Sequence, residues 1–156
     1  MASTFLIRPV AASDETRVIE MSRAFLRETA YHDRIKEDDE HVKSLVACVR
    51  EHGEFWVAVL DGRVVGMFGA ILFDHPILNR RLGAEVLWWV DPDARSSGAG
   101  AKLFHVAEQW AAEGGAVGMQ FSAYRDPVLE RLYRRLGYHP FEVVFYKEFV
   151  PCEGTI

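Results

Sequence analysis

The chain has little of what marks disulfide-stabilised or metal-binding proteins. It holds only two cysteines among 156 residues, Cys48 in a helical pattern and Cys152 near the end of the sequence. Two cysteines so placed predict neither a disulfide framework nor a zinc site. None of the six histidines stands in a metal-binding spacing such as HExxH. We therefore expect a protein without a metal ion.

Long apolar runs and an excess of positive charge are also missing. No apolar run approaches the roughly 20 residues that cross a bilayer, and residues 1–10, MASTFLIRPV, lack the basic and long apolar regions of a signal peptide. The formal net charge of −5 disfavours a nucleic-acid partner. These absences predict a cytoplasmic protein with neither membrane nor nucleic acid as a partner.

The composition is that of an ordinary globular protein. Hydrophobic residues make up 49% of the chain and charged residues 26%. A chain of 156 residues can bury a substantial core without disulfides. We predict one domain over residues 1–156.

Hydrophobic periodicity predicts the order β-α-α-β-β-β-α-β-α-β. Asp61-Gly62 suits a type I′ turn between two of the strands. The fold class is α/β, with a mixed β-sheet flanked by helices, because a Rossmann domain would alternate strand and helix from its start. The expected strands are residues 4–10, 55–60, 64–71, 84–90, 117–123 and 141–149; the expected helices are 13–30, 38–52, 101–113 and 126–137; residues 74–83 are expected to form a loop.

The most informative stretch is Arg95-Ser96-Ser97-Gly98-Ala99-Gly100, which lies between an apolar strand pattern and a helix pattern that opens at Ala101. A strand that turns through glycines into a helix aims backbone N–H groups and the positive end of the helix dipole at one point. Such a point favours an anion, most plausibly a phosphate. The same glycines also fit a plain tight connection.

Two motifs resemble the signatures of the GNAT family of N-acetyltransferases. Val90-Asp91-Pro92 followed by Arg95-x-x-Gly98-x-Gly100 resembles the family's acetyl-coenzyme A signature, and residues 132–138, LYRRLGY, resemble its second signature. They occur in the family's order and separation. The resemblance covers the whole chain as topology and residues 84–146 in detail. It implies a GNAT-like fold and acetyl-coenzyme A as co-substrate.

The resemblance also implies which residues bind the cofactor. The backbone at the end of the strand before the turn would bind the pantetheine arm as an added strand would, and the turn amides would bind the pyrophosphate. The side chains of the two tryptophans are expected to pack in the core, one on each face. Asp126 stands where relatives often carry an asparagine that contacts the cofactor, although it also suits a helix cap. The implied cofactor residues are Trp88, Trp89, Val90, Arg95, Ser96, Ser97, Gly98, Ala99, Gly100, Ala101 and Asp126.

Tyr133 is implied as the general acid that protonates the leaving thiolate of coenzyme A. A phenol with a pKa of about 10 is protonated at neutral pH, and a thiolate with a pKa near roughly 8.5 leaves more easily when a proton arrives. Spacing alone also fits a tyrosine on the buried face of an amphipathic helix, since it falls in line with Leu129, Leu132 and Leu136.

Glu85 is the first candidate for the general base, because an amine must be neutral to attack a thioester. Several relatives place a base on this strand. A register shift of one residue would turn Glu85 to the wrong face. A solvent relay from Glu28 or Asp74 remains the alternative.

The acceptor is expected to be a primary amine of a small molecule or peptide. Residues 13–40 carry five Lys or Arg against nine Asp or Glu, which suits a cationic amine as well as ordinary solvated helix faces. Two other functions stay open at this point: a non-catalytic coenzyme A-binding sensor, and a structural or interaction domain. Homodimer formation is left open too.

Overall fold

The structure, a computed structural model, describes residues 5–29 and 39–149. The chain divides into two compact units, Met1–Tyr124 and Arg125–Ile156. The expected element ends at residues 4, 30 and 38 and the cysteine near the end of the sequence lie outside the described residues. That residues 1–156 form one domain stays a prediction.

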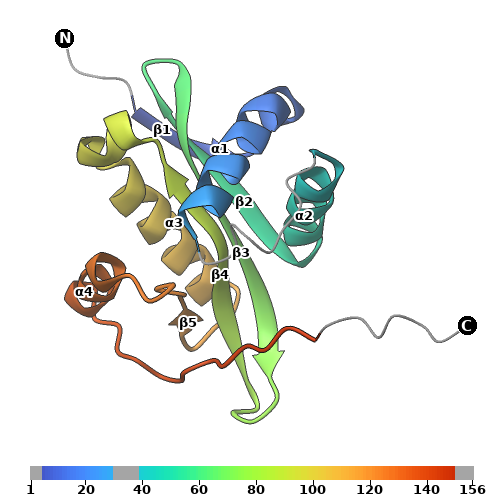
Figure 1. The fold of residues 1–156 in the computed structure, drawn as a ribbon, viewed down its shortest axis with the longest axis vertical. Coiled ribbons are helices and arrows are strands. Elements are labelled where there is room, and N and C mark those ends of the chain that lie inside the picture. The colour runs from blue at the N-terminus through green and yellow to red at the C-terminus, as the bar shows by residue number, and fades with distance from the viewer. Residues whose placement is uncertain (1–4, 30–38, 150–156) are drawn as a thin grey trace, which may run out of the picture. The chain divides into compact units, whose positions relative to one another are not determined.

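The first unit is built on a five-stranded sheet in the order β1-β2-β3-β4-β5 (Figure 1). Neighbouring strands are antiparallel from β1 to β4, whereas β5 runs parallel to β4. The mixed sheet confirms the predicted fold class. The strands are Phe5–Pro9 (β1), Gly53–Leu60 (β2), Arg63–His75 (β3), Arg80–Val90 (β4) and Met119–Gln120 (β5).

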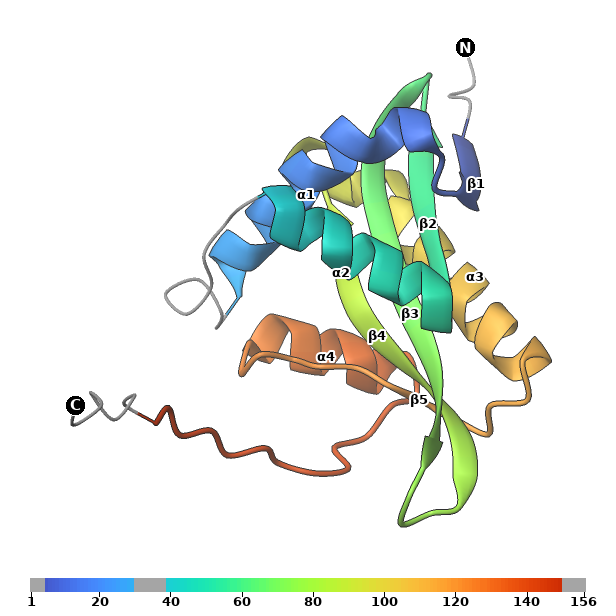
Figure 2. The same ribbon diagram turned by 90° about the vertical axis from the view of Figure 1, so that its right-hand side faces the viewer.

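Helices cover both faces of the sheet. Figure 2 shows α1 (Glu15–Glu28) and α2 (Asp39–His52) on one face and α3 (Ala99–Glu113) on the other. Because strand side chains alternate in direction, Val57 of β2 packs with the first two helices and Ala58 packs with the third. Two hydrophobic cores result, one on each side of the sheet. Short 3-10 turns, Ala12–Asp14 and Pro92–Ser97, precede α1 and α3.

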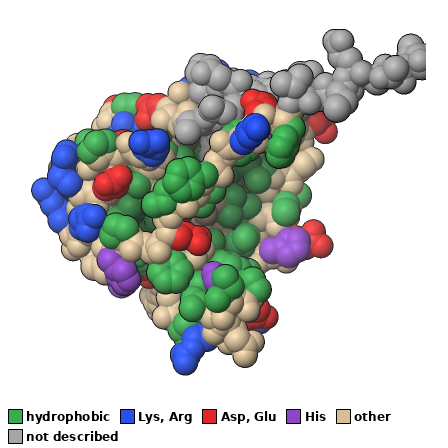
Figure 3. Space-filling model, turned by 60° about the horizontal axis from the view of Figure 1, so that its bottom comes forward, with side chains coloured by type: hydrophobic (Ala, Val, Ile, Leu, Met, Phe, Trp, Pro, Cys, Tyr) green, Lys and Arg blue, Asp and Glu red, His purple; other side chains and the backbone are tan. Residues whose placement is uncertain are grey.

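Two hairpins join the central strands. Asp61 and Gly62 have φ of 49° and 80°, as the predicted type I′ turn requires. The loop predicted over residues 74–83 is wrong, because β3 and β4 continue pairing to His75 opposite Arg80. Asn79 supplies a left-handed position with φ of 50°. Apolar side chains, green at the bottom of Figure 3, are exposed where this hairpin comes forward.

The second unit contains α4 (Pro127–Arg135). Asp126 caps it by accepting a hydrogen bond from the amide of Val128 at 2.8 Å. Gly137, with φ of 89°, follows its end. The cap confirms one of the two roles considered for Asp126.

The strand expected over residues 141–149 is wrong, since the structure has no secondary structure there. Alternating apolar residues favour an extended chain, but a strand also needs a neighbouring strand to pair with, and none of the five described strands forms a β-ladder with this segment. Its apolar side chains are exposed. The strand expected over residues 117–123 is shortened to β5 for a similar reason, because only two of its residues pair with β4.

Candidate active site

The two edges of β4 differ along its length. β4 pairs with β3 from Arg80 to Val90, but it pairs with β5 only at Gly83 and Ala84. The ladder with β3 skips Val86, which is therefore the extra residue of a β-bulge. A bulge bends its strand and increases the local twist. It lies two residues beyond Ala84, the last residue of β4 that pairs with β5, and β5 ends at the partner residue Gln120.

The backbone direction beyond the bulge follows from one hydrogen bond. Asp91 donates its amide to the carbonyl of Val65 on β3 at 2.8 Å. Backbone groups alternate in direction along a strand, so Val90 turns its amide and carbonyl to the opposite edge, which β5 has left. An extended ligand can lie along this edge and use the same hydrogen-bonding pattern as a strand.

The turn between β4 and α3 is held by a glycine and a serine. Gly98 has φ of 86°, and a Cβ there would meet no atom within 4 Å, so the requirement for glycine is conformational rather than steric. Ser97 Oγ donates to the carbonyl of Ala94 at 2.6 Å and accepts from the amide of Ala99 at 3.2 Å. The side chain of Ser97 therefore satisfies the first amide of α3.

The next two amides of α3 point to an anion site. The bond from Lys102 N–H to the carbonyl of Gly98, at 3.1 Å, closes the first turn of the helix. The helix therefore offers no acceptor to the amides of Gly100 and Ala101, which favours an anion beside them. A Cβ on Gly100 would lie 3.6 Å from Trp88 and Val90, which is ordinary contact, so a small side chain fits and a longer one has to pass the indole.

The side chain of Arg95 is held by three groups of the protein. Its Nε donates to the carbonyl of Val90 at 3.1 Å, its Nη2 pairs with Glu28 at 3.1 Å, and its guanidinium lies 5.0 Å from the centre of the Trp89 ring. The sequence placed Arg95 in the turn but gave no sign of the pair with Glu28, because the two residues are far apart in the chain. The exposed side chain of Ser96 completes this turn.

The two tryptophans point to opposite faces, as expected. Trp89 is buried on the side of α1, and its Nε1 donates to Asp91 at 3.1 Å. Trp88 is half-buried on the side of α3, within 5.7 Å of Phe68 and 5.5 Å of Phe104 between ring centres. Their side chains therefore belong to the two cores, and contact of their backbone with a cofactor stays a prediction.

Glu85 lies at the point where β4 and β5 diverge. It is half-buried, and its Oε2 accepts a hydrogen bond from the amide of Ser122 at 3.3 Å. Desolvation raises the pKa of Glu85 to about 7, although the Ser122 amide acts in the opposite direction. A carboxylate that titrates near neutral pH is suited to exchange protons at pH 7. Nothing in the sequence indicated the contact with Ser122.

The alternative bases have other partners. Glu28 is exposed and paired with Arg95 at 3.1 Å, and Asp74 is exposed and paired with Arg81 at 3.3 Å. Neither has the desolvated surroundings of Glu85. Glu85 stands opposite Ala70, which packs in the core on the α3 side, so its side chain lies on that face of the sheet and not on the face of α1 and α2. The role of Glu85 as the base stays a prediction.

The candidate acid is in the second unit. Tyr133 is buried in α4 with 8% of its surface exposed, and its carbonyl accepts hydrogen bonds from the amides of Leu136 and Tyr138, both at 3.0 Å. This burial agrees with the amphipathic pattern. The catalytic role of Tyr133 stays a prediction.

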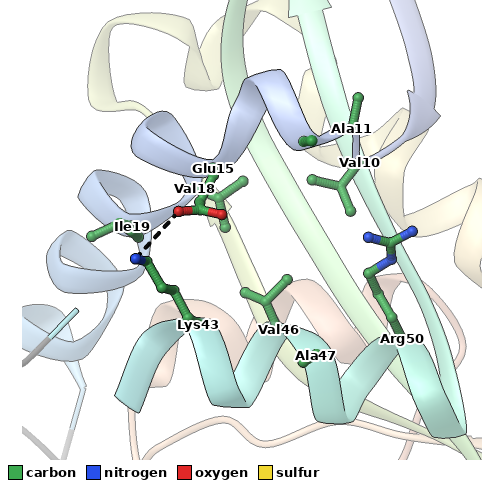
Figure 4. A pocket seen from close by; sticks show the side chains of 10 residues that line it. Val10, Ala11, Glu15, Val18, Ile19, Lys43, Val46, Ala47 and Arg50 are labelled. Atoms are coloured by element: carbon green, nitrogen blue, oxygen red, sulfur yellow. Dashed lines mark ion pairs between the residues drawn. The ribbon is translucent and has the colours of Figure 1, made fainter. Parts of the chain in front are cut away.

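A separate pocket of about 180 Å³ lies between α1 and α2 (Figure 4). Its lining is largely apolar, with Lys43 paired to Glu15 at 3.5 Å and Arg50 at the edge. None of its lining residues belongs to the β4–α3 turn. We therefore locate the candidate active site at β4 and the turn rather than at this pocket.

The described residues lack the features of two further kinds of protein. They contain no group of three or more His, Cys, Asp or Glu side chains arranged to hold a metal ion. Among the helices of residues 5–29 and 39–149, none combines the length and apolar character that a membrane span requires.

The sequence matches the family model of the acetyltransferase (GNAT) family over residues 16–138. The chain belongs to this family. The family is the one that the two sequence motifs predicted, and the roles of β4 and of the turn that follows it stay predictions. A comparison with curated proteins finds no match.

Solved structures share the GNAT fold at low identity. A transcriptional regulator from Bacillus halodurans C-125 is 18% identical with a TM-score of 0.75, and the match covers 94% of this chain and 100% of the other. An acetyltransferase from Trypanosoma brucei is 17% identical with a TM-score of 0.73, covering 94% and 100%. Glucosamine-6-phosphate N-acetyltransferase from Arabidopsis thaliana is 17% identical with a TM-score of 0.71, covering 94% and 99%. At these identities the likeness shows the fold alone.

Proposed function

We propose that this GNAT acetyltransferase moves an acetyl group from acetyl-coenzyme A to a primary amine by direct attack. The observation that carries the proposal is the half of β4 that does not pair with β5, which leads through the turn of residues 91–98 to the amides at the start of α3. One surface thus offers a strand edge for an extended amide-containing arm and a helix N-terminus for a pyrophosphate. Both chemical features belong to coenzyme A.

The residues present fit this cofactor. The amides of Gly100 and Ala101 have no acceptor within the helix, and Gly98 leaves open space beside them. The amide of Val90 faces the edge that the pantetheine arm would occupy, and its carbonyl accepts a hydrogen bond from Arg95 Nε. Acetyl-coenzyme A would supply the thioester, while the protein contributes orientation and proton transfer.

Glu85 is the proposed base. The ammonium group of the acceptor gives a proton to its carboxylate, directly or through water, and the neutral nitrogen then attacks the thioester carbon. The hydrogen bond from Ser122 fixes one carboxylate oxygen. The N–C bond forms as the C–S bond breaks.

Tyr133 is the proposed acid. Its hydroxyl gives a proton to the departing thiolate, so the products are an acetylated amine and the free thiol of coenzyme A. The acetylated nitrogen gives up its second proton to the tyrosinate of Tyr133, directly or through water, and Glu85 returns its proton to solvent.

The acceptor is proposed to be cationic before it loses its proton. The exposed carboxylates of α1 and α2 would attract such an amine electrostatically. They are Glu15, Glu20, Glu28, Asp39, Glu40 and Glu51.

The proposal is tested by release of free thiol from acetyl-coenzyme A across a panel of polyamines, aminosugars and peptides with a free amino terminus. Amine-dependent thiol release, with the acetylated amine identified by mass spectrometry, supports it. Coenzyme A binding in calorimetry without turnover on any amine would instead favour a non-catalytic sensor. Absence of coenzyme A binding would contradict both the acetyltransferase and the sensor.

A further inference from the structure

A connected set of side chains joins the β4–α3 turn to both ends of α1. Arg17, near the start of α1, pairs with Asp91, and Asp91 accepts a hydrogen bond from Trp89 Nε1 at 3.1 Å. Arg95 lies over the Trp89 ring at 5.0 Å and pairs with Glu28, the last residue of α1, at 3.1 Å. We call these five residues the α1 network.

The two ends of the α1 network differ in strength. At the first end the Asp91 side chain is 13% exposed, so its pair with Arg17 is well shielded from water. At the other end Arg95 and Glu28 are 49% and 55% exposed. Exposed pairs contribute little to stability and break easily. The Arg95–Glu28 end is therefore the one that a ligand can strengthen or weaken.

Arg95 is oriented by the protein in this structure. Its Nε is engaged by the Val90 carbonyl and its Nη2 by Glu28, while its flat face covers Trp89. Each of these groups turns the guanidinium toward α1. The side chain of Arg95 thus connects the turn to a helix end that is remote in sequence.

We propose that Arg95 is a positioning residue that couples occupancy of the β4–α3 turn to the order of the last turn of α1. The coupling rests on the proposed function, in which coenzyme A occupies the amides of Gly100 and Ala101 and the acceptor amine approaches the α1 end. A ligand that immobilises the turn also immobilises the backbone that carries Arg95. Glu28 then loses less freedom when it pairs with Arg95, and α1 becomes better ordered.

The test is hydrogen–deuterium exchange with coenzyme A as the probe, on the wild type, Glu28→Gln and Glu20→Gln. Glu20→Gln is the matched control, because it breaks an exposed pair with Arg17 on the same helix but leaves Arg95 and Glu28 in place. In the wild type and the control, coenzyme A should slow exchange at residues 95–101 and, by about fivefold, at residues 25–29. In Glu28→Gln the slowing at 95–101 should persist and that at 25–29 should disappear.

Equal slowing at residues 25–29 in the wild type and Glu28→Gln would overturn the coupling. A phosphate-binding role for the Arg95 side chain makes a different prediction, because Glu28→Gln would release the guanidinium and tighten coenzyme A binding in calorimetry. Tighter binding would therefore overturn the positioning role as well. A wild type that responds at 95–101 but not at 25–29 contradicts only the coupling, whereas no response at 95–101 contradicts the proposed function and the coupling with it.

Discussion

The two halves of β4 differ in the strands that pair with them. In residues 80–84 the strand has β3 on one side and pairs with β5 on the other near Gly83. In residues 85–90 it pairs with β3 alone, after the bulge at Val86. Residues 80–84, RRLGA, include two arginines, whereas residues 85–90, EVLWWV, are apolar apart from Glu85. The neighbouring strand makes the difference, and where it departs the backbone becomes available to a ligand.

The largest expected effect concerns the turn that follows residues 85–90, the open half of β4, which does not pair with β5. Gly100→Glu should weaken coenzyme A binding by about 10³-fold, because unit charges 4 Å apart at an effective dielectric constant near 20 repel by about 4 kcal/mol. Titration calorimetry measures the change, with circular dichroism to verify the fold. Gly100→Gln is the control that keeps the size and removes the charge. Unaltered coenzyme A affinity in Gly100→Glu would contradict phosphate binding at this turn.

The next effect concerns the leaving group. Tyr133→Phe keeps the ring but removes the proton, so turnover should fall by on the order of 10²-fold while coenzyme A affinity stays nearly the same. Tyr138→Phe, five residues further along the chain, is the matched control. An unchanged turnover number in Tyr133→Phe, with the chemical step rate-limiting, would leave Tyr133 as a packing residue only.

Glu85 stands at the boundary between the two halves, and its variant should show a smaller and pH-dependent effect. Glu85→Gln should lower turnover by roughly tenfold at pH 7 and be partly rescued at higher pH, where more of the amine is neutral. In the wild type, the rate should rise with pH through a pKa of about 7. A stable Glu85→Gln enzyme with a wild-type pH profile would exclude Glu85 and leave Glu28 or Asp74.

Glu85 also predicts a change in stability with pH. Its pKa is raised from an ordinary value of 4.5 to about 7 in the folded protein, so the folded state holds the proton more tightly than the unfolded state. The wild type should therefore lose stability, relative to Glu85→Gln, as pH rises from about 4.5 to 7. Thermal unfolding of both proteins across this range measures the difference. Parallel curves would contradict the desolvation of Glu85.

The smallest effect on function is expected in the paired half. A Cβ on Gly83 would lie 3.1 Å from Ala111 Cβ and 3.2 Å from Met119 Cγ, so Gly83→Ala should cost about 1–3 kcal/mol of stability through overpacking. Coenzyme A affinity should not change, because this half pairs with both neighbours. Denaturant unfolding and calorimetry on the same variant separate the two quantities. A loss of coenzyme A affinity in Gly83→Ala at unchanged stability would contradict the expected difference between the two halves of β4.

Sequence reasoning placed the candidate site through local signals and missed what depends on pairing between distant segments. The glycines of the turn, the Asp126 cap and the opposed tryptophans each follow from neighbouring residues, and the structure bears out their local geometry. The bulge at Val86 has no local signature, because it arises from the register of β3 against β4.

Distant contacts explain the other differences. The pair between Arg95 and Glu28 joins residues 67 positions apart, which no spacing rule could reveal. The segment over residues 141–149 has the pattern of a strand, but pairing depends on a partner that its own sequence does not specify. Pro76 is a residue typical of loops and favoured the prediction of a loop over residues 74–83. In the structure it occupies only the turn of the β3–β4 hairpin.

Hydrogen–deuterium exchange along β4, with and without coenzyme A, tests the central claim most directly. We predict that coenzyme A slows exchange in residues 85–101, at the open half of β4 and the following turn. Exchange in residues 80–84 should not change. Slowing confined to the pocket between α1 and α2, or no slowing in residues 85–101, would contradict it.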